Sequence, residues 1–170
     1  MDATSNRIEI SVEINGRSRT DRVPVRMHVA DYLRHQCGLT GTHVGCEQGV
    51  CGMCTVEVDG AIVKSCLILA AQLDGKSVWT VESLAGPEEL SPLQQAFKRH
   101  HALQCGYCTP GFLMVAHALE KRGEAMTREQ IREEISGVLC RCTGYEGIIL
   151  AIEEHLSTRG GAHEADGRVG

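Results

Sequence analysis

Cysteines are the residues of this 170-residue chain best suited to chemistry, and eight of the nine fall into two sets of four. The first set begins in a glycine-rich stretch, residues 45–54, and ends at a later cysteine. Four residues separate its first two members and two residues separate the next two. This spacing is typical of a plant-type [2Fe–2S] cluster. The members of the first set are Cys46, Cys51, Cys54 and Cys66.

The glycines of this stretch support the iron–sulfur interpretation. A cluster held by four thiolates is negatively charged, so backbone N–H groups must point at its sulfurs. Gly45, Gly49 and Gly52 allow the tight wrapping that this requires, including positive φ angles. The alternative is a structural zinc site, since Zn²⁺ also binds four cysteines. Zinc sites usually use two separated cysteine pairs, whereas three cysteines crowd one loop here, which favours the cluster.

The second set consists of Cys105 and Cys108, followed by Cys140 and Cys142. Each pair lies at a break between predicted helices. Helix N-termini offer free N–H groups and a positive dipole end, which stabilise an anionic cluster. By spacing alone this set suits zinc or a [4Fe–4S] cluster as well. The ninth cysteine, Cys37, fits neither spacing, and we interpret it as a small buried apolar residue.

The first half of the chain predicts a small mixed sheet with one helix packed on it. Residues 8–14 alternate apolar and polar side chains, as a half-buried strand does. Asn15-Gly16 predicts a hairpin to an edge strand over residues 17–25, and a short helix follows over residues 29–36. The remaining predicted strands are residues 55–58, 61–63 and 77–81.

The composition changes at residues 82–91, which read as a linker, and the chain beyond them predicts a four-helix bundle. N-terminal capping signals precede all four helices at Ser91, Thr109, Thr127 and Thr143. The predicted helices reach residues 101, 122, 135 and 156. A tail over residues 159–170 is rich in glycine and charge, and we expect it to be mobile.

Charge and composition exclude several classes of protein. A formal net charge of −5, with no block of lysine or arginine, argues against nucleic-acid binding. The sequence shows no signal-peptide pattern and no apolar stretch long enough to cross a bilayer. We therefore expect a cytoplasmic protein whose cysteines bind metal in a reducing compartment and do not form disulfides.

Three motifs together resemble the iron–sulfur subunit of the molybdenum hydroxylases, the xanthine dehydrogenase and aldehyde oxidoreductase family. The resemblance extends from about residue 7 to residue 156. The motifs are GCEQGVCGMCTV at residues 45–56, QCGYCTPG at residues 104–111 and LCRCTGY at residues 139–145.

The resemblance implies an α+β protein with an N-terminal ferredoxin-like β-grasp domain over residues 1–84 and a four-helix domain over residues 85–158. Each domain would hold one [2Fe–2S] cluster, the first set of cysteines holding the outer one. The second set would hold the cluster nearer to molybdenum. The resemblance also implies that Gln104 and Cys142 contact the molybdopterin of a partner, although residue type alone favours a solvated Gln104.

The implied function is electron relay, with no catalytic residue in this chain. A large subunit would carry a molybdopterin dinucleotide and hydroxylate an N-heteroaromatic compound, an aldehyde or a similar substrate. Electrons would leave one at a time through both clusters, commonly to FAD in a medium subunit, within a dimer of heterotrimers. Arg141, between two cysteines, is a candidate for tuning the cluster potential, or else part of a surface salt bridge.

Two other functions remain as alternatives. One is a free-standing electron carrier of ferredoxin type, although such a carrier needs no second domain with its own cluster. The other is a zinc scaffold without redox activity, which the glycine-rich loop opposes.

Overall fold

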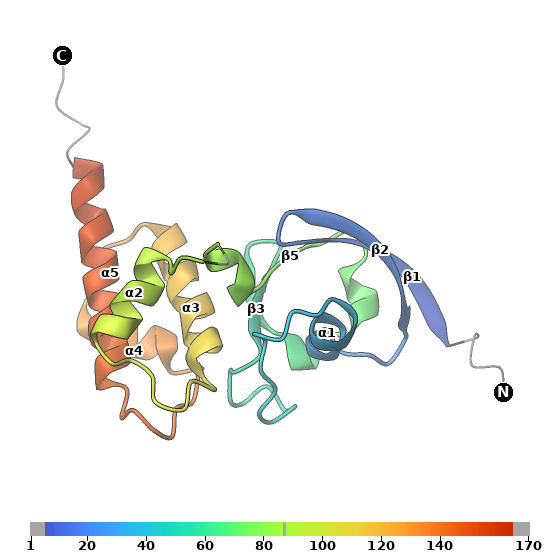
Figure 1. Ribbon diagram of the computed structural model, residues 1–170, viewed down its shortest axis with the longest axis horizontal. Coiled ribbons are helices and arrows are strands. Elements are labelled where there is room, and N and C mark those ends of the chain that lie inside the picture. Colours follow the sequence, from blue (N-terminus) through green and yellow to red (C-terminus); the bar gives the residue numbers. More distant parts are fainter. Residues whose placement is uncertain (1–5, 87, 165–170) are drawn as a thin grey trace, which may run out of the picture.

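The computed structural model describes residues 6–86 and 88–164, with only the backbone of residues 159–164. Figure 1 shows two lobes side by side, a sheet lobe from the first half of the chain and a helical lobe from the second. The predicted α+β fold is confirmed. Each lobe has its own hydrophobic core, and Cys54 and Cys66 form a separate small buried cluster with Ala30.

The sheet lobe contains five strands in the order β2-β1-β5-β3-β4. The sheet is mixed, because β1 pairs antiparallel with β2 and parallel with β5. The strands are β1 (Arg7–Ile14), β2 (Arg17–Pro24), β3 (Thr55–Val58), β4 (Ala61–Lys64) and β5 (Ser77–Trp79).

The first hairpin follows the sequence prediction. Asn15 and Gly16 adopt φ angles of 50° and 76°, as a tight two-residue turn requires. Ile10, Val12 and Ile14 of β1 are buried while their neighbours face solvent. The strand β2 lies at the edge of the sheet, as its proline predicts.

The predicted helix over residues 29–36 is present, but its hydrogen-bonding pattern changes from α-helical to π-helical along its length. The helix α1 (Val29–Asp31) continues as a π-helical turn, Tyr32–Gln36, in which the N–H of Cys37 donates to the carbonyl of Tyr32. Tyr32 is buried, and its hydroxyl donates to Asp21 at 2.5 Å. Cys37 is half-buried and packs against the sheet core, and burial raises the pKa of its thiol.

The strand β3 is buried on both faces, which its alternating pattern did not indicate. Val56 and Val58 join the core of the sheet lobe. Glu57 points to the opposite face, where both of its carboxylate oxygens accept from Lys121 of the helical lobe at 2.9 and 2.8 Å. A charged side chain on β3 is buried because a helix of the other lobe covers that face.

The helical lobe contains the four predicted helices. Ser91 and Thr127 cap the first and third of them through reciprocal capping boxes with Gln94 and Gln130. Gly123, at a φ of 67°, ends the second. The helices are α2 (Pro92–Arg99), α3 (Thr109–Arg122), α4 (Arg128–Ile135) and α5 (Glu146–Glu164).

Two predicted caps are wrong. Thr109 is the first residue of α3, and Cys108 occupies the N-cap position without a side-chain cap. Thr143 lies before α5, where its N–H and hydroxyl contact the sulfur of Cys140 at 3.4 and 3.1 Å. The left-handed φ angles of Gly144 and Tyr145, 65° and 69°, delay the start of α5 to Glu146.

The predicted mobile tail, residues 159–170, continues as helix to Glu164, and residues 165–170 lie outside the described residues. In the part of the chain that the structure describes, no helix is both long and apolar enough to cross a membrane.

Candidate iron–sulfur centres

The first cysteine set lies where the glycine-rich loop folds back on itself. The sulfur of Cys46 accepts from the N–H groups of Cys51 and Gln48, each at 3.4 Å. These bonds, that of Cys51 foremost, lower the pKa of Cys46 to about 7 and so favour its thiolate. Gly49 and Gly52 adopt φ angles of 74° and 73°, which lets the backbone turn around the sulfurs.

The other three cysteines of this set are buried. Their exposed fractions are 7%, 2% and 8% for Cys51, Cys54 and Cys66. The β3–β4 hairpin brings Cys66 back beside Cys54, and the N–H and hydroxyl of Ser65 both donate to the carbonyl of Cys54. Burial raises the pKa of Cys66 to about 11, so its thiolate needs a bound cation to compensate for lost hydration.

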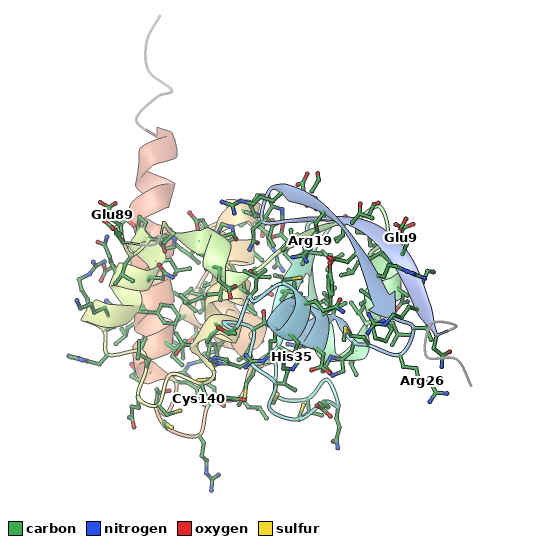
Figure 2. All side chains as sticks on the ribbon, turned by 45° about the vertical axis from the view of Figure 1, so that its right-hand side comes forward. Glu9, Arg19, Arg26, His35, Glu89 and Cys140 are labelled. Carbon is green, nitrogen blue, oxygen red and sulfur yellow. The ribbon has the colours of Figure 1, made fainter. Side chains whose placement is uncertain are left out.

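The second set lies at one end of the helical lobe, where Figure 2 labels Cys140. Cys108 is buried, and burial raises its pKa to about 12. Burial also opposes ionisation of Cys140, but the Thr143 hydroxyl and nearby backbone N–H groups outweigh it and lower the pKa of that thiol. Cys105 and Cys142 are exposed. This set therefore opens to the surface on one side.

The sulfurs in both sets approach one another in pairs. This arrangement suits a [2Fe–2S] cluster, in which each of two irons takes two thiolates. The sulfur pairs are Cys46 with Cys51, Cys54 with Cys66, Cys105 with Cys142, and Cys108 with Cys140.

The two sets are joined by a direct backbone contact. The N–H of Leu139 donates to the carbonyl of Cys51 at 2.9 Å, and Leu139 is bonded to Cys140. One hydrogen bond thus links a residue of the first set to the neighbour of a residue of the second. The sequence did not indicate this contact, because the two partners lie far apart in the chain.

Glycines make this close approach possible. A Cβ on Gly52 would lie 2.1 Å from the carbonyl oxygen of Gly137, and a Cβ on Gly111 would lie 2.5 Å from the carbonyl oxygen of Gly52. Both distances are too short for any side chain. Gly52, Gly111 and Gly137 therefore form a backbone seam between the two lobes, which we call the glycine seam.

A second contact joins the loops of the two sets through Tyr107. Its hydroxyl donates to the carbonyl of Val44 at 2.8 Å, and its own carbonyl lies 2.7 Å from Nδ1 of His43. The rings of His43 and Tyr107 stack with their centroids 4.5 Å apart. Sequence reasoning missed this pair, although a tyrosine between two candidate metal-binding cysteines was a visible signal.

Gln104 is exposed beside the second set, as a residue that meets a partner must be. Arg141 is also exposed, and it forms no ion pair within the part of the chain described. Two exposed leucines, Leu103 and Leu139, flank the same loops. These exposed residues all lie in the two loops that carry the second set.

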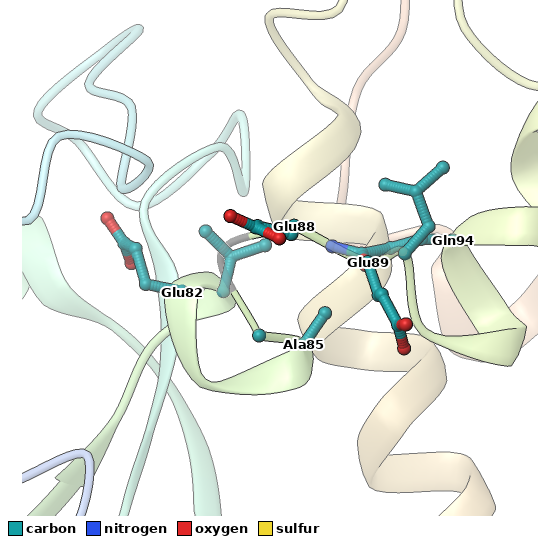
Figure 3. A pocket seen from close by; sticks show the side chains of 8 residues that line it. Glu82, Ala85, Glu88, Glu89 and Gln94 are labelled. Atoms are coloured by element: carbon teal, nitrogen blue, oxygen red, sulfur yellow. The ribbon is translucent and has the colours of Figure 1, made fainter.

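A surface hollow of about 500 Å³ lies at the linker between the lobes (Figure 3). Glu82, Glu88 and Glu89 contribute to its lining. The carboxylate of Glu82 is already engaged, since it accepts from the N–H of Gly41 and the hydroxyl of Thr80. An acidic lining is unsuited to the phosphates of a flavin nucleotide.

Comparison with known proteins identifies the class to which these two sites belong. The 2Fe-2S iron-sulfur cluster binding domain matches residues 12–80, and the [2Fe-2S] binding domain matches residues 80–153. The chain is therefore built from two [2Fe–2S] binding domains with cysteine clusters.

Relatives place the chain in a particular family. The nicotine 6-hydroxylase small subunit of Paenarthrobacter nicotinovorans is 57% identical over 148 residues, covering 87% of this chain and 89% of that protein. Caffeine dehydrogenase subunit gamma of Pseudomonas sp. (strain CBB1) is 51% identical over 147 residues, covering 85% and 88%. A chain of quinoline 2-oxidoreductase from Pseudomonas putida 86 has 51% identity and a TM-score of 0.88, covering 94% of this chain and 99% of that one.

The chain belongs to the small [2Fe–2S] subunits of the molybdenum hydroxylases. It is an electron-transfer subunit of a multi-subunit oxidoreductase, and the family acts on N-heteroaromatic compounds or aldehydes.

Proposed function

We propose that the two cysteine sets form an ordered relay for single electrons. The second set, Cys105, Cys108, Cys140 and Cys142, holds the cluster that receives electrons from the molybdenum subunit. The first set, Cys46, Cys51, Cys54 and Cys66, holds the cluster that passes them on. The observation that carries this proposal is the hydrogen bond from Leu139 to Cys51, which joins the backbones of the two sets at 2.9 Å.

Exposure supports the order of the relay. Cys105 and Cys142 are exposed in this chain, whereas three cysteines of the first set are buried. The surface around the second set includes two exposed leucines, which suits a protein partner. We assign this surface to the large molybdopterin subunit, with Gln104 and Cys142 in contact with the pterin.

The chain's own groups prepare the sites for charge. A [2Fe–2S] cluster, when bound, accepts and releases one electron at a time. The N–H groups of Cys51 and Gln48 stabilise negative charge at Cys46, and those near Cys140 do the same in the second set. The glycine seam keeps the loops that carry the two sets packed against each other during electron transfer.

The names of the relatives support a narrower substrate class. Nicotine, caffeine and quinoline, which appear in those names, are all N-heteroaromatic compounds. We propose that the large subunit hydroxylates a compound of this class. We further propose that electrons pass to FAD in a medium subunit of a cytoplasmic dimer of heterotrimers.

The alternative of a free-standing ferredoxin-type carrier does not fit the relatives, which are subunits of a hydroxylase and a dehydrogenase.

The test uses the native protein, purified without denaturation. Size-exclusion chromatography should show this chain eluting with a much larger subunit. Electron paramagnetic resonance (EPR) of the reduced complex should show two distinct signals, with about four irons in each copy of this chain, two for each [2Fe–2S] site. A single signal with about half that iron, together with zinc, would contradict the relay.

A further inference from the structure

Lys64 reaches from the sheet lobe to the helical lobe beside both cysteine sets. It is the last residue of β4, two positions before Cys66. Its ammonium group donates to the carbonyl oxygen of Gly137 at 2.9 Å and to the hydroxyl of Thr55 at 3.1 Å. Thr55 directly follows Cys54, so Lys64 contacts the segment that carries the first cysteine set.

The carbonyl that Lys64 contacts belongs to the glycine seam. Gly137 precedes Cys140 by three residues, and its carbonyl packs against Gly52, which directly follows Cys51. The ammonium group of Lys64 therefore lies where the loops of the two sets touch.

The charge of Lys64 is not neutralised by a carboxylate within the described ranges. Lys121, which also crosses between the lobes, pairs with Glu57 at 2.8 Å, and Lys76 pairs with Asp59 at 2.7 Å. Among the residues that the structure describes, the hydrogen-bond partners of the Lys64 ammonium group are two neutral oxygens. It is also half-buried, so solvent and salt screen its field less than they screen an exposed lysine.

We propose that the positive charge of Lys64 raises the reduction potentials of both clusters. This inference rests on the cluster assignment proposed above. Each cluster gains a negative charge on reduction, and a nearby cation stabilises that state. The hydrogen bond to Gly137 holds this charge at the seam, where it acts on both sets. Because both potentials rise, Lys64 affects how readily the clusters take up electrons from their donor and pass them to their acceptor.

The experiment is a redox titration of the whole heteromeric enzyme, followed by EPR so that each cluster is measured separately. Lys64→Gln removes the charge but keeps a donor for Gly137, and Lys64→Arg keeps the charge. Lys76→Gln is the matched control, because Lys76 contacts Asp59 at the opposite end of the β3–β4 hairpin. We expect Lys64→Gln to lower both midpoint potentials, and Lys64→Arg and Lys76→Gln to leave them close to those of the wild type.

Several outcomes would overturn the proposal. Two intact signals at unchanged potentials in Lys64→Gln would show that the charge is not coupled to the clusters, while leaving the relay itself standing. Equal shifts in Lys64→Gln and Lys64→Arg would show that packing, not charge, is responsible, and a thermal melt of each variant would reveal that loss. If Lys64→Gln does not fold, Lys64→Met replaces it as the neutral variant, and unchanged potentials there would equally refute the proposal. Absence of two signals in the wild type would instead refute the proposed function.

Discussion

The two cysteine sets differ in how completely this chain encloses them. Three members of the first set are buried, and backbone N–H groups of the same loop surround the fourth, Cys46. In the second set Cys105 and Cys142 are exposed, and only Cys108 is fully buried. The chain therefore encloses the first set of cysteines, whereas the second set is open to the surface on one side.

The difference follows from how each set is built. One glycine-rich loop supplies three cysteines of the first set, and a hairpin returns the fourth, so the chain wraps around its own sulfurs. The second set is assembled from two loops between helices. Helices bury their apolar faces against each other, and the connecting loops remain at the surface at the end of the bundle.

Loss of a single cysteine should have the largest effect, and it should remove one cluster while leaving the other in place. Cys51→Ser should remove the first cluster, and Cys108→Ser the second, because each removes a thiolate that one iron needs. Iron should fall from about four to about two per chain in each variant, with the loss of a different EPR signal.

The serine variants also test whether the sites are independent. Serine keeps the backbone carbonyl of residue 51, so the hydrogen bond from Leu139 can persist in Cys51→Ser. If both signals vanish in Cys51→Ser, the two lobes form a single folding unit and the comparison of separate sites fails.

A smaller but substantial effect is expected at the glycine seam. Gly52→Ala combines a strained φ of 73° with a Cβ only 2.1 Å from a backbone oxygen. It should destabilise the protein by at least about 3 kcal/mol. Gly60→Ala is the control, because Gly60 has a φ of 82° but no atom within 4 Å of the added Cβ. That variant should lose only about 1–2 kcal/mol.

Chemical denaturation followed by circular dichroism measures both glycine variants. Similar losses for Gly52→Ala and Gly60→Ala would mean that the lobes separate readily and that the close approach at residue 52 contributes little.

The smallest expected difference is kinetic and concerns the open side of the second site. When the small subunit is separated from its large partner, an iron chelator should remove iron from the second site faster than from the first. The reason is that Cys105 and Cys142 are exposed while three cysteines of the first set are buried. The readout is the decay of each EPR signal over time. Equal decay of both signals would remove the distinction between an enclosed site and an open one.

Local sequence signals predicted most of the elements correctly. Asn15-Gly16, Ser91 and Thr127 mark a turn and two caps that the structure contains, because such signals act within a few residues. Thr143 is not a helix cap, although its local pattern suits a helix start. The two residues after it, Gly144 and Tyr145, adopt φ angles of 65° and 69°, so the helix begins only at Glu146.

The contacts between the lobes could not be predicted in this way. Glu57 lies on an ordinary alternating strand, and only the packing of α3 makes it a buried carboxylate paired with Lys121. Tyr107 reaches Val44, and Leu139 reaches Cys51, across separations that no local pattern encodes.

The sequence by itself determined which eight cysteines form two sets, the α+β order of the elements and the family, because spacing and motif are properties of the linear chain. Only the tertiary structure decided how the sulfurs pair, which set is enclosed and which is open, and where the two sets touch. Those features depend on how two separate cores pack together. That packing places a half-buried lysine, three glycines and one backbone hydrogen bond between the two sites.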